Sequence, residues 1–139
     1  MPFVLDTDMI TALQNEHADV LARVRLLPRA DIFVTIVSYQ EQMEGRLSTL
    51  NRQFRPAALI AAYERLAQTL VYYRAANVLA YDNRAAHIGD DLHMRLRRMG
   101  TKDRRIAAIM LAHGYTLVTR NTVDFQDVPG LSLEDWMAS

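Results

Sequence analysis

The segment TKDRRIAAIMLAHGYTLVTRNTVDF, residues 101–125, gives the strongest indication of the fold. It begins with Thr101, a favourable helix cap, and its apolar residues then recur on one side as far as Gly114, which predicts a helix that ends at the glycine. A short apolar run over 116–119 follows and is typical of a buried strand. An acid, Asp124, comes just after that run. This order of helix, strand and acidic loop indicates an α/β protein.

Short apolar runs alternate with helical patterns along the whole chain. The predicted strands cover 3–5, 32–37, 78–81, 116–119 and 131–133. A first short helix is predicted to start at Asp8 or Thr11. The other predicted helices cover 17–27, 38–50, a long segment after Pro56, 84–99 and 101–113. The run over 32–37 is apolar on both faces, as in a parallel strand that is covered on both sides. We therefore expect a three-layer α/β/α sandwich around a mostly parallel five-stranded sheet.

Two helices carry patterns that predict specific contacts. The segment from Ser38 to Glu41 has the spacing of a capping box, in which the helix begins at the serine and the glutamate reaches back to the serine N–H. The long helix after Pro56, which suits the first turn, has its apolar residues on one face. That face consists of Leu59, Ile60, Tyr63, Leu66, Ala67, Leu70 and Val71.

Length and composition bound the class of protein. A chain of 139 residues is expected to form one domain over residues 1–139. Its start has no signal-peptide pattern, and no apolar run approaches the about 20 residues that cross a bilayer, so we expect a soluble, cytoplasmic protein. The absence of cysteine excludes disulfides and thiolate metal sites. Neither a glycine-rich phosphate loop nor a nucleophile elbow is present, which argues against ATPases, Rossmann dehydrogenases and serine hydrolases.

Acidic residues fall where the predicted strands end. Each of four acids follows a strand or lies in the first turn of the next helix: Asp6, Glu41, Asp103 and Asp124. In an open parallel sheet, ligands bind at the carboxyl ends of the strands, where the strand order reverses. Ionised carboxylates gathered there would raise one another's pKa unless a cation joined them, and Mg²⁺ or Mn²⁺ is the natural partner of oxygen ligands. The pattern predicts metal-dependent phosphodiester chemistry.

Each of these acids also has an ordinary structural role open to it. Asp6 can cap the next helix, Glu41 can complete its capping box, and Asp103 can interact with a helix dipole. Asn121 and Asp124 can be turn residues. Position alone therefore leaves both interpretations open.

The basic residues also allow two interpretations. Sixteen basic and sixteen acidic side chains cancel, so a nuclease would have to place acids inside a cleft and bases on its rim. A basic run contains Arg95, Arg97, Arg98, Lys102, Arg104 and Arg105. It is either a solvated helix face or a surface that holds RNA phosphates. The RNA-contact candidates are Arg46, Lys102, Arg104 and Arg120.

Four segments, in order and nearly end to end, resemble PIN-domain ribonucleases, and in particular the VapC toxins of bacterial VapBC toxin–antitoxin pairs. They are Val4–Ile10, Val37–Gly45, Gly100–Ala108 and Ala112–Phe125, followed by Val128–Leu131 and Glu134–Trp136. The resemblance implies that Asp6 and Asp103 are metal ligands, with Glu41 bound through water. Asp124 matches the family's acid before phenylalanine, and Asn121 stands where many relatives carry an acid. Asp8 stands where the family usually has asparagine.

The resemblance also implies an activity and partners. The activity is hydrolysis of RNA by a Mg²⁺- or Mn²⁺-dependent endoribonuclease whose catalytic group is Asp6, Glu41, Asp103, Asp124 and Asn121. The implied partners are an RNA substrate, a VapB-like antitoxin and a second toxin copy in a homodimer. The alternative is a PIN fold with weakened catalysis that only binds RNA or a partner, because Asn121 contributes no charge. A response-regulator-like domain fits less well, since its lysine should follow the last strand and Lys102 lies before a helix.

Overall fold

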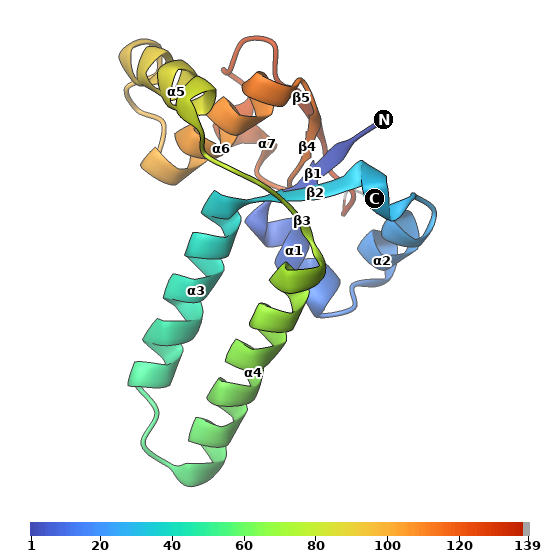
Figure 1. The fold of residues 1–139 in the computed structure, drawn as a ribbon, viewed down its shortest axis with the longest axis vertical. Coiled ribbons are helices and arrows are strands. Elements are labelled where there is room, and N and C mark those ends of the chain that lie inside the picture. The colour runs from blue at the N-terminus through green and yellow to red at the C-terminus, as the bar shows by residue number, and fades with distance from the viewer. Residues whose placement is uncertain (138–139) are drawn as a thin grey trace.

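A computed structural model describes residues 1–137, so the last two residues of the predicted domain 1–139 lie outside the described residues. Five parallel strands form one sheet in the order β3-β2-β1-β4-β5. The strands are β1 (Phe3–Leu5), β2 (Ile32–Thr35), β3 (Asn77–Leu79), β4 (Thr116–Val118) and β5 (Ser132–Glu134). The chain runs outward from β1 to β3 and then returns to place β4 on the other side of β1 (Figure 1). The strand order therefore reverses between β1 and β4, where a ligand site is expected.

Helices cover both faces of the sheet, which confirms the predicted α/β sandwich. They are α1 (Thr7–Gln14), α2 (Ala18–Arg25), α3 (Ile36–Asn51), α4 (Pro56–Ala75), α5 (Asn83–Arg95), α6 (Thr101–His113) and α7 (Thr122–Phe125), with a short 3₁₀ turn, η1 (Arg29–Asp31), before β2. None of the helices described within residues 1–137 is long and apolar enough to cross a membrane.

Alternation along the strands divides the interior into two cores. Val4 and Leu117 point to one face, where they pack with α5, α6 and α7. Leu5 and Val118 point to the other face, where they pack with α1, α2 and α4. Successive residues of a strand point to opposite faces, so two neighbouring positions on each strand serve two cores. Burial of a large apolar side chain contributes about 1.5–3 kcal/mol.

Helix α6 is buried along one whole stretch and holds the sheet to α5. Five consecutive residues are buried: Ile106, Ala107, Ala108, Ile109 and Met110. Ala108 lies under α5, since its Cβ is 3.7 Å from the position a Cβ would take at Gly89. The helix ends at Gly114 with φ of 70°, as the sequence predicted. This packing fixes the first turn of α6, which carries Asp103.

The boundary between β2 and α3 differs from the prediction. The strand stops at Thr35, and Ile36 and Val37 already belong to α3. The Thr35 hydroxyl accepts the Ser38 N–H at 3.1 Å, so Thr35 is the helix cap and the predicted capping box of Ser38 and Glu41 is wrong. The apolar run misled because Val37 is buried in the first turn of the helix and continues the hydrophobic pattern of the strand.

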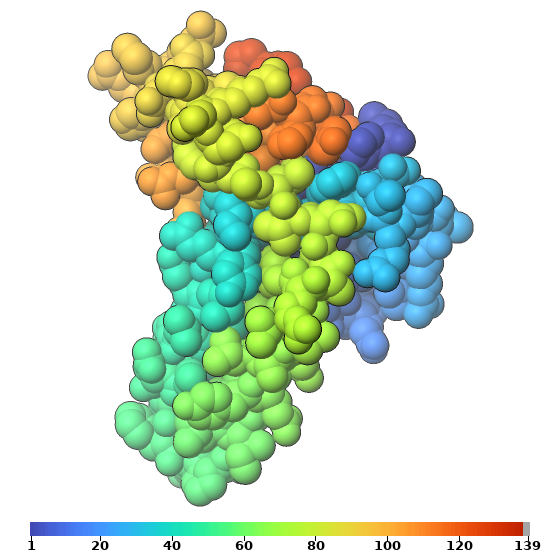
Figure 2. Space-filling view, viewed as in Figure 1, coloured from blue at the N-terminus to red at the C-terminus, as the bar shows by residue number. Residues whose placement is uncertain are grey.

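The predicted apolar face of α4 is mostly exposed and not packed against the core. Ile60 and Val71 are 59% and 64% exposed, and Tyr63 and Leu70 are exposed as well. The buried residues of α4 are instead Ala62, Thr69 and Tyr73. Helices α3 and α4 form a hairpin that projects from the sheet as a separate lobe (Figures 1 and 2). Periodicity shows that a face is apolar but does not show what covers it.

The segment that joins α5 to α6 also differs from the prediction. Helix α5 ends at Arg95 rather than continuing to Met99, and Leu96 leaves the helical region with φ of −122° and ψ of 64°. Gly100 takes the cap position of α6, so Thr101 is the first residue of that helix rather than its cap. Residues 96–100 therefore form a loop beside Asp103.

The Thr35 cap gives a stability prediction. Replacing Thr35 with alanine should lower the free energy of unfolding by about 1 kcal/mol, because the Ser38 N–H loses its acceptor at the start of α3. Chemical denaturation followed by circular dichroism measures the change. Thr35→Ser keeps the hydroxyl and is the control. Equal destabilisation by the two substitutions would show that the lost methyl group, and not the cap, is responsible.

Candidate active site

The site begins with Asp6, which lies at the point where β1 ends and the strand order reverses. Its carboxylate caps α1, since Oδ1 accepts the Thr7 N–H at 2.8 Å. The other oxygen, Oδ2, accepts the hydroxyl of Thr119 at 2.8 Å, and Thr119 directly follows β4. Asp6 is only 7% exposed. The carboxylate is therefore held by the ends of both strands that border the switch point.

The environment of Asp6 opposes its negative charge. The pKa of this carboxyl group is raised from 3.8 to about 7, first by burial and then by the charges of Asp8 and Asp103. The hydrogen bonds from Thr119 and Thr7 act in the opposite direction and are already included in that value. A carboxyl group with this pKa carries a full charge at neutral pH only when a cation compensates it.

Asp8 lies in the first turn of α1, close to the Thr119 hydroxyl that binds Asp6. Its Oδ2 accepts the backbone N–H of Arg120 at 3.1 Å and lies 3.4 Å from the Thr119 hydroxyl. Its Oδ1 is buried and has no hydrogen-bond partner among residues 1–137. Burial raises the pKa of Asp8 as well. An orphaned buried carboxylate oxygen is costly unless another ligand binds it.

Two further acids complete this side of the site. Asp103, half-buried in the first turn of α6, has a pKa raised by burial and then by the charges of Asp124, Glu41 and Asp8. The Glu41 Oε1 accepts the Thr7 hydroxyl at 2.9 Å. That hydroxyl is also 2.9 Å from the hydroxyl of Ser38. The acids of four separate segments thus act on one another electrostatically.

The fourth predicted segment carries Asn121 and Asp124, both of which are exposed. The Asn121 side-chain amide donates to Asp124 Oδ2 at 2.6 Å. The Asn121 backbone N–H donates to the Thr119 hydroxyl at 3.0 Å. The amide therefore orients the acid that stands beside it, and the same threonine that binds Asp6 anchors this loop.

The donor set fits a divalent cation, although the side chains do not surround one as they stand. No three histidine or acidic side chains within residues 1–137 converge closely enough to hold an ion. The hydrogen bonds of Glu41 to Thr7 and of Asp124 to Asn121 hold these two carboxylates in place. However, the candidate ligand atoms are all oxygen, neighbouring acids raise the pKa of Asp6 and of Asp103, and Asp8 Oδ1 accepts no hydrogen bond. Such a group suits a hard cation such as Mg²⁺ or Mn²⁺.

The RNA-contact candidates lie in different surroundings. The Lys102 ammonium pairs with Glu44 of α3. The Arg46 guanidinium donates to Thr69 at 3.1 Å and to Gln14 at 3.4 Å, so it is held between α4 and α1. Arg104 is half-buried in the first turns of α6, and Arg120 is exposed just after β4.

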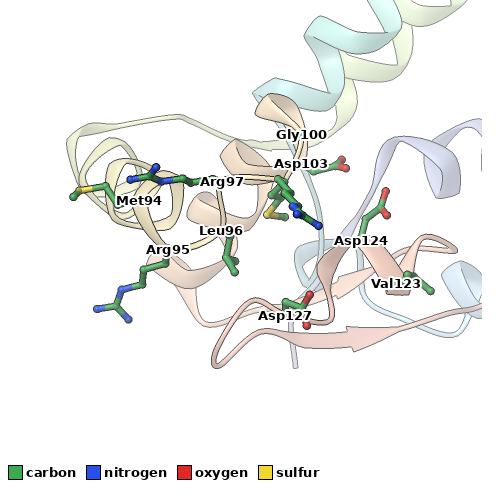
Figure 3. Close-up of a pocket in the computed structure, with 11 residues that line it drawn as sticks. Met94, Arg95, Leu96, Arg97, Gly100, Asp103, Val123, Asp124 and Asp127 are labelled. Atoms are coloured by element: carbon green, nitrogen blue, oxygen red, sulfur yellow. The ribbon is translucent and has the colours of Figure 1, made fainter.

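A hollow of about 680 Å³ opens beside the acids (Figure 3). One wall is the segment 94–100, and the other carries Val123, Asp124 and Asp127, with Asp103 between them. Three arginines of the predicted basic run line this hollow: Arg95, Arg97 and Arg98. The sequence left their basic run open between a solvated helix face and a surface that holds RNA phosphates, and these three arginines were not singled out among the RNA-contact candidates.

The hydroxyl partners of the acids were also missed. Thr7, Ser38 and Thr119 bind or neighbour the carboxylates, yet each looked like an ordinary helix or strand residue in the sequence. A signal was present, because Thr7 directly follows Asp6 and Thr119 is the last residue of a predicted strand.

The raised pKa of Asp6 predicts how stability depends on pH. Because the folded-state pKa of about 7 exceeds 3.8, the folded state binds more protons than the unfolded state between these values, and metal-free protein loses stability as pH rises through that range. Asp6→Asn removes this titration. In EDTA near pH 8, the variant should melt about 5 °C higher than the unsubstituted protein.

The difference should shrink near pH 5, where Asp6 is protonated in the folded protein. Thermal unfolding followed by circular dichroism measures it, and Asp19→Asn on the exposed surface of α2 is the control. A difference in melting temperature that is the same at both pH values would contradict the assignment of the raised pKa to Asp6.

Comparison with known proteins agrees with this fold. The model of the PIN domain family matches residues 3–131. The chain is 30% identical to the tRNA(fMet)-specific endonuclease VapC of Shigella flexneri over 98% of both chains. It is 27% identical to Ribonuclease VapC1 of Rickettsia felis, over 96% of this chain and 95% of that one. DNA-bound VapBC from Salmonella typhimurium superposes with a TM-score of 0.78 at 26% identity, over 98% of each chain. The chain belongs to the PIN domain family.

Proposed function

We propose that this protein is a divalent-metal-dependent endoribonuclease and the VapC-type toxin of a toxin–antitoxin pair. The observation that carries the proposal is the group of mutually repelling acids around Asp6 and Asp103 at the switch point between β1 and β4. Two relatives that match nearly the whole chain are named as a ribonuclease and as a tRNA-specific endonuclease, which supports RNA as the substrate. An RNA substrate is in keeping with action in the cytoplasm.

The roles of the acids follow from their positions. Asp6, Asp103 and Asp124 are the proposed ligands of Mg²⁺ or Mn²⁺, with Glu41 bound through a water molecule. When bound, the cation lowers the pKa of a coordinated water and neutralises charge on the scissile phosphate. Asp8 adds negative charge and its free oxygen to the same place.

The hydrogen-bond partners keep these acids in position. Thr119 and the Thr7 N–H hold the two oxygens of Asp6, and the Thr7 hydroxyl holds Glu41. Asn121 holds Asp124 and needs no charge to do so. Partners of this kind fix the orientation of metal ligands, and their loss typically costs about 10- to 100-fold in metal affinity or activity.

A VapB-like antitoxin and a second copy of the chain are the proposed protein partners. Support for the antitoxin comes from the structure of VapBC from Salmonella typhimurium, which this chain resembles over 98% of its length. The exposed apolar side chains of α4, which include Ile60, Tyr63, Leu70 and Val71, form a surface of the kind that protein partners cover.

The nuclease predicts a metal-dependent reaction with a defined site. Purified protein should cut RNA from a whole-cell extract in Mg²⁺ or Mn²⁺ and should not cut it in EDTA. Asp103→Asn should lower the cleavage rate by at least about 100-fold, because loss of a direct ligand should exceed the effect of losing a partner behind it. Asp19→Asn, on exposed α2, should leave the rate unchanged. Gel electrophoresis of the RNA measures both.

The same experiment separates the alternative function. A folded protein that binds RNA in EDTA but cuts none in either metal would be the binding module, and Asn121→Asp would then be the substitution to try. If the Asp103→Asn variant cuts RNA as fast as the unsubstituted protein, the proposed role of these acids in the reaction is wrong.

A further inference from the structure

The hollow beside the acids has the size of a small-molecule site. Its volume of about 680 Å³ falls within the range of about 300–1,000 Å³ that is usual for ligand pockets. It is open to solvent between the α5–α6 segment and α7, and Asp103 and Asp124 stand at its edge (Figure 3). An RNA strand bound at the proposed reaction centre can therefore place its neighbouring nucleotide in this hollow.

Charge is divided between the two walls of this hollow. Asp124 and Asp127 lie on the α7 wall, while the arginines lie on the α5–α6 wall. Arg95 is already paired with Asp91 at 3.3 Å. Arg97 and Arg98 are exposed and form no ion pair with any of the residues 1–137. The α5–α6 wall thus offers two uncompensated guanidinium groups, the side chain best suited to phosphate.

Apolar side chains lie between these charges. Leu96 and Met99 line the hollow and pack against the core below. Met94 and Val123 also line it and are 73% and 68% exposed. Exposed apolar groups in a hollow of this size suit the face of a nucleobase. A paired base within a helix is stacked on its neighbours, so only an unpaired nucleotide can place its base there.

We propose that this hollow is a nucleotide subsite, in which an unpaired nucleotide next to the cleaved bond is bound with its phosphate on Arg97 and Arg98 and its base on the apolar wall. The proposal rests on the proposed function and assigns Arg97, Arg98 and the apolar wall of the hollow to the binding of its RNA substrate. Asp127 keeps the phosphate on the arginine side, because its carboxylate repels an anion from the opposite wall.

Binding of a short single-stranded RNA of random sequence tests the subsite. The RNA carries a fluorescein label, binding is followed by fluorescence anisotropy in Mg²⁺, and Asp6→Asn in every protein used prevents cleavage. Arg97→Gln with Arg98→Gln should weaken binding about ten-fold and reduce the slope of log affinity against log salt by about 0.7, because one phosphate loses its cationic partners. An unlabelled duplex of matched length should compete poorly.

The control removes the same charge elsewhere. Arg52→Gln with Arg55→Gln changes two exposed arginines at the tip of the α3–α4 hairpin, on the lobe opposite the hollow. This pair should change RNA binding by less than about two-fold, since it lowers only the overall charge. In cleavage assays without the Asp6 substitution, the Arg97 and Arg98 pair should raise KM about ten-fold and change kcat by less than about two-fold, as expected when ground-state and transition-state binding are lost equally.

Equal weakening by the two double variants would overturn the subsite, because it would show a general effect of charge. Competition by the duplex that equals competition by the single strand would overturn the requirement for an unpaired nucleotide.

Failure of the subsite is distinguishable from failure of the nuclease. If Asp103→Asn abolishes cleavage while the Arg97 and Arg98 pair leaves binding and KM unchanged, the nuclease stands and the subsite falls. If the arginine pair abolishes RNA binding while the unsubstituted protein cuts nothing, the hollow binds RNA but serves no cleavage, and the nuclease falls.

Discussion

The parallel pairing of β1 with β4 is the contact on which the candidate site depends. Leu5 lies opposite Val118, and the Asp6 N–H extends the pairing by donating to the Val118 carbonyl at 2.9 Å. This register places Asp6 beside Thr119 and brings α1 and the α7 loop to one edge of the sheet. A slip of one residue would turn the side chains of β1 to the opposite faces and remove Asp6 from its partner. The same pairing joins the two cores, because Leu5 and Val118 serve one and Val4 and Leu117 serve the other.

The buried, mutually repelling carboxylates of the site are electrostatically unfavourable, and the packing of the rest of the fold holds them in place. Asp6, Asp8 and Asp103 all have pKa values raised first by burial and then by one another's charges or those of nearby acids. A protein interior accepts such a group only where surrounding packing fixes it, and here α6 is clamped between α5 and the sheet along five buried residues. Sites where local rules are broken in this way are typically functional sites.

Much of the fold could be predicted from the sequence, because strands buried on both faces and a helix ended by glycine leave strong local patterns. The parallel sheet, the helix up to Gly114 and membership of the PIN family were predicted and are confirmed. The start of α3 and the exposed face of α4 were not, since Val37 serves a helix within a strand-like run and the α4 pattern does not reveal that α4 belongs to a projecting lobe. The acids of the site could be placed from strand ends, whereas their hydroxyl partners and the arginine-lined hollow depend on how distant segments meet. The roles of the acids in catalysis stay predictions.

The Thr119 hydroxyl has a further consequence for how this protein can change over evolution. It has one proton, which it gives to Asp6 at 2.8 Å, and its lone pairs accept the Asn121 N–H at 3.0 Å. Serine would keep both interactions. Valine would fill the same space and suit a buried strand end, yet it would take a partner from Asp6 and from the Asp124 loop in a single step. The position after β4 thus accepts several side chains of similar size, but only a hydroxyl keeps both hydrogen bonds. Neutral substitution there is therefore confined to residues that carry a hydroxyl.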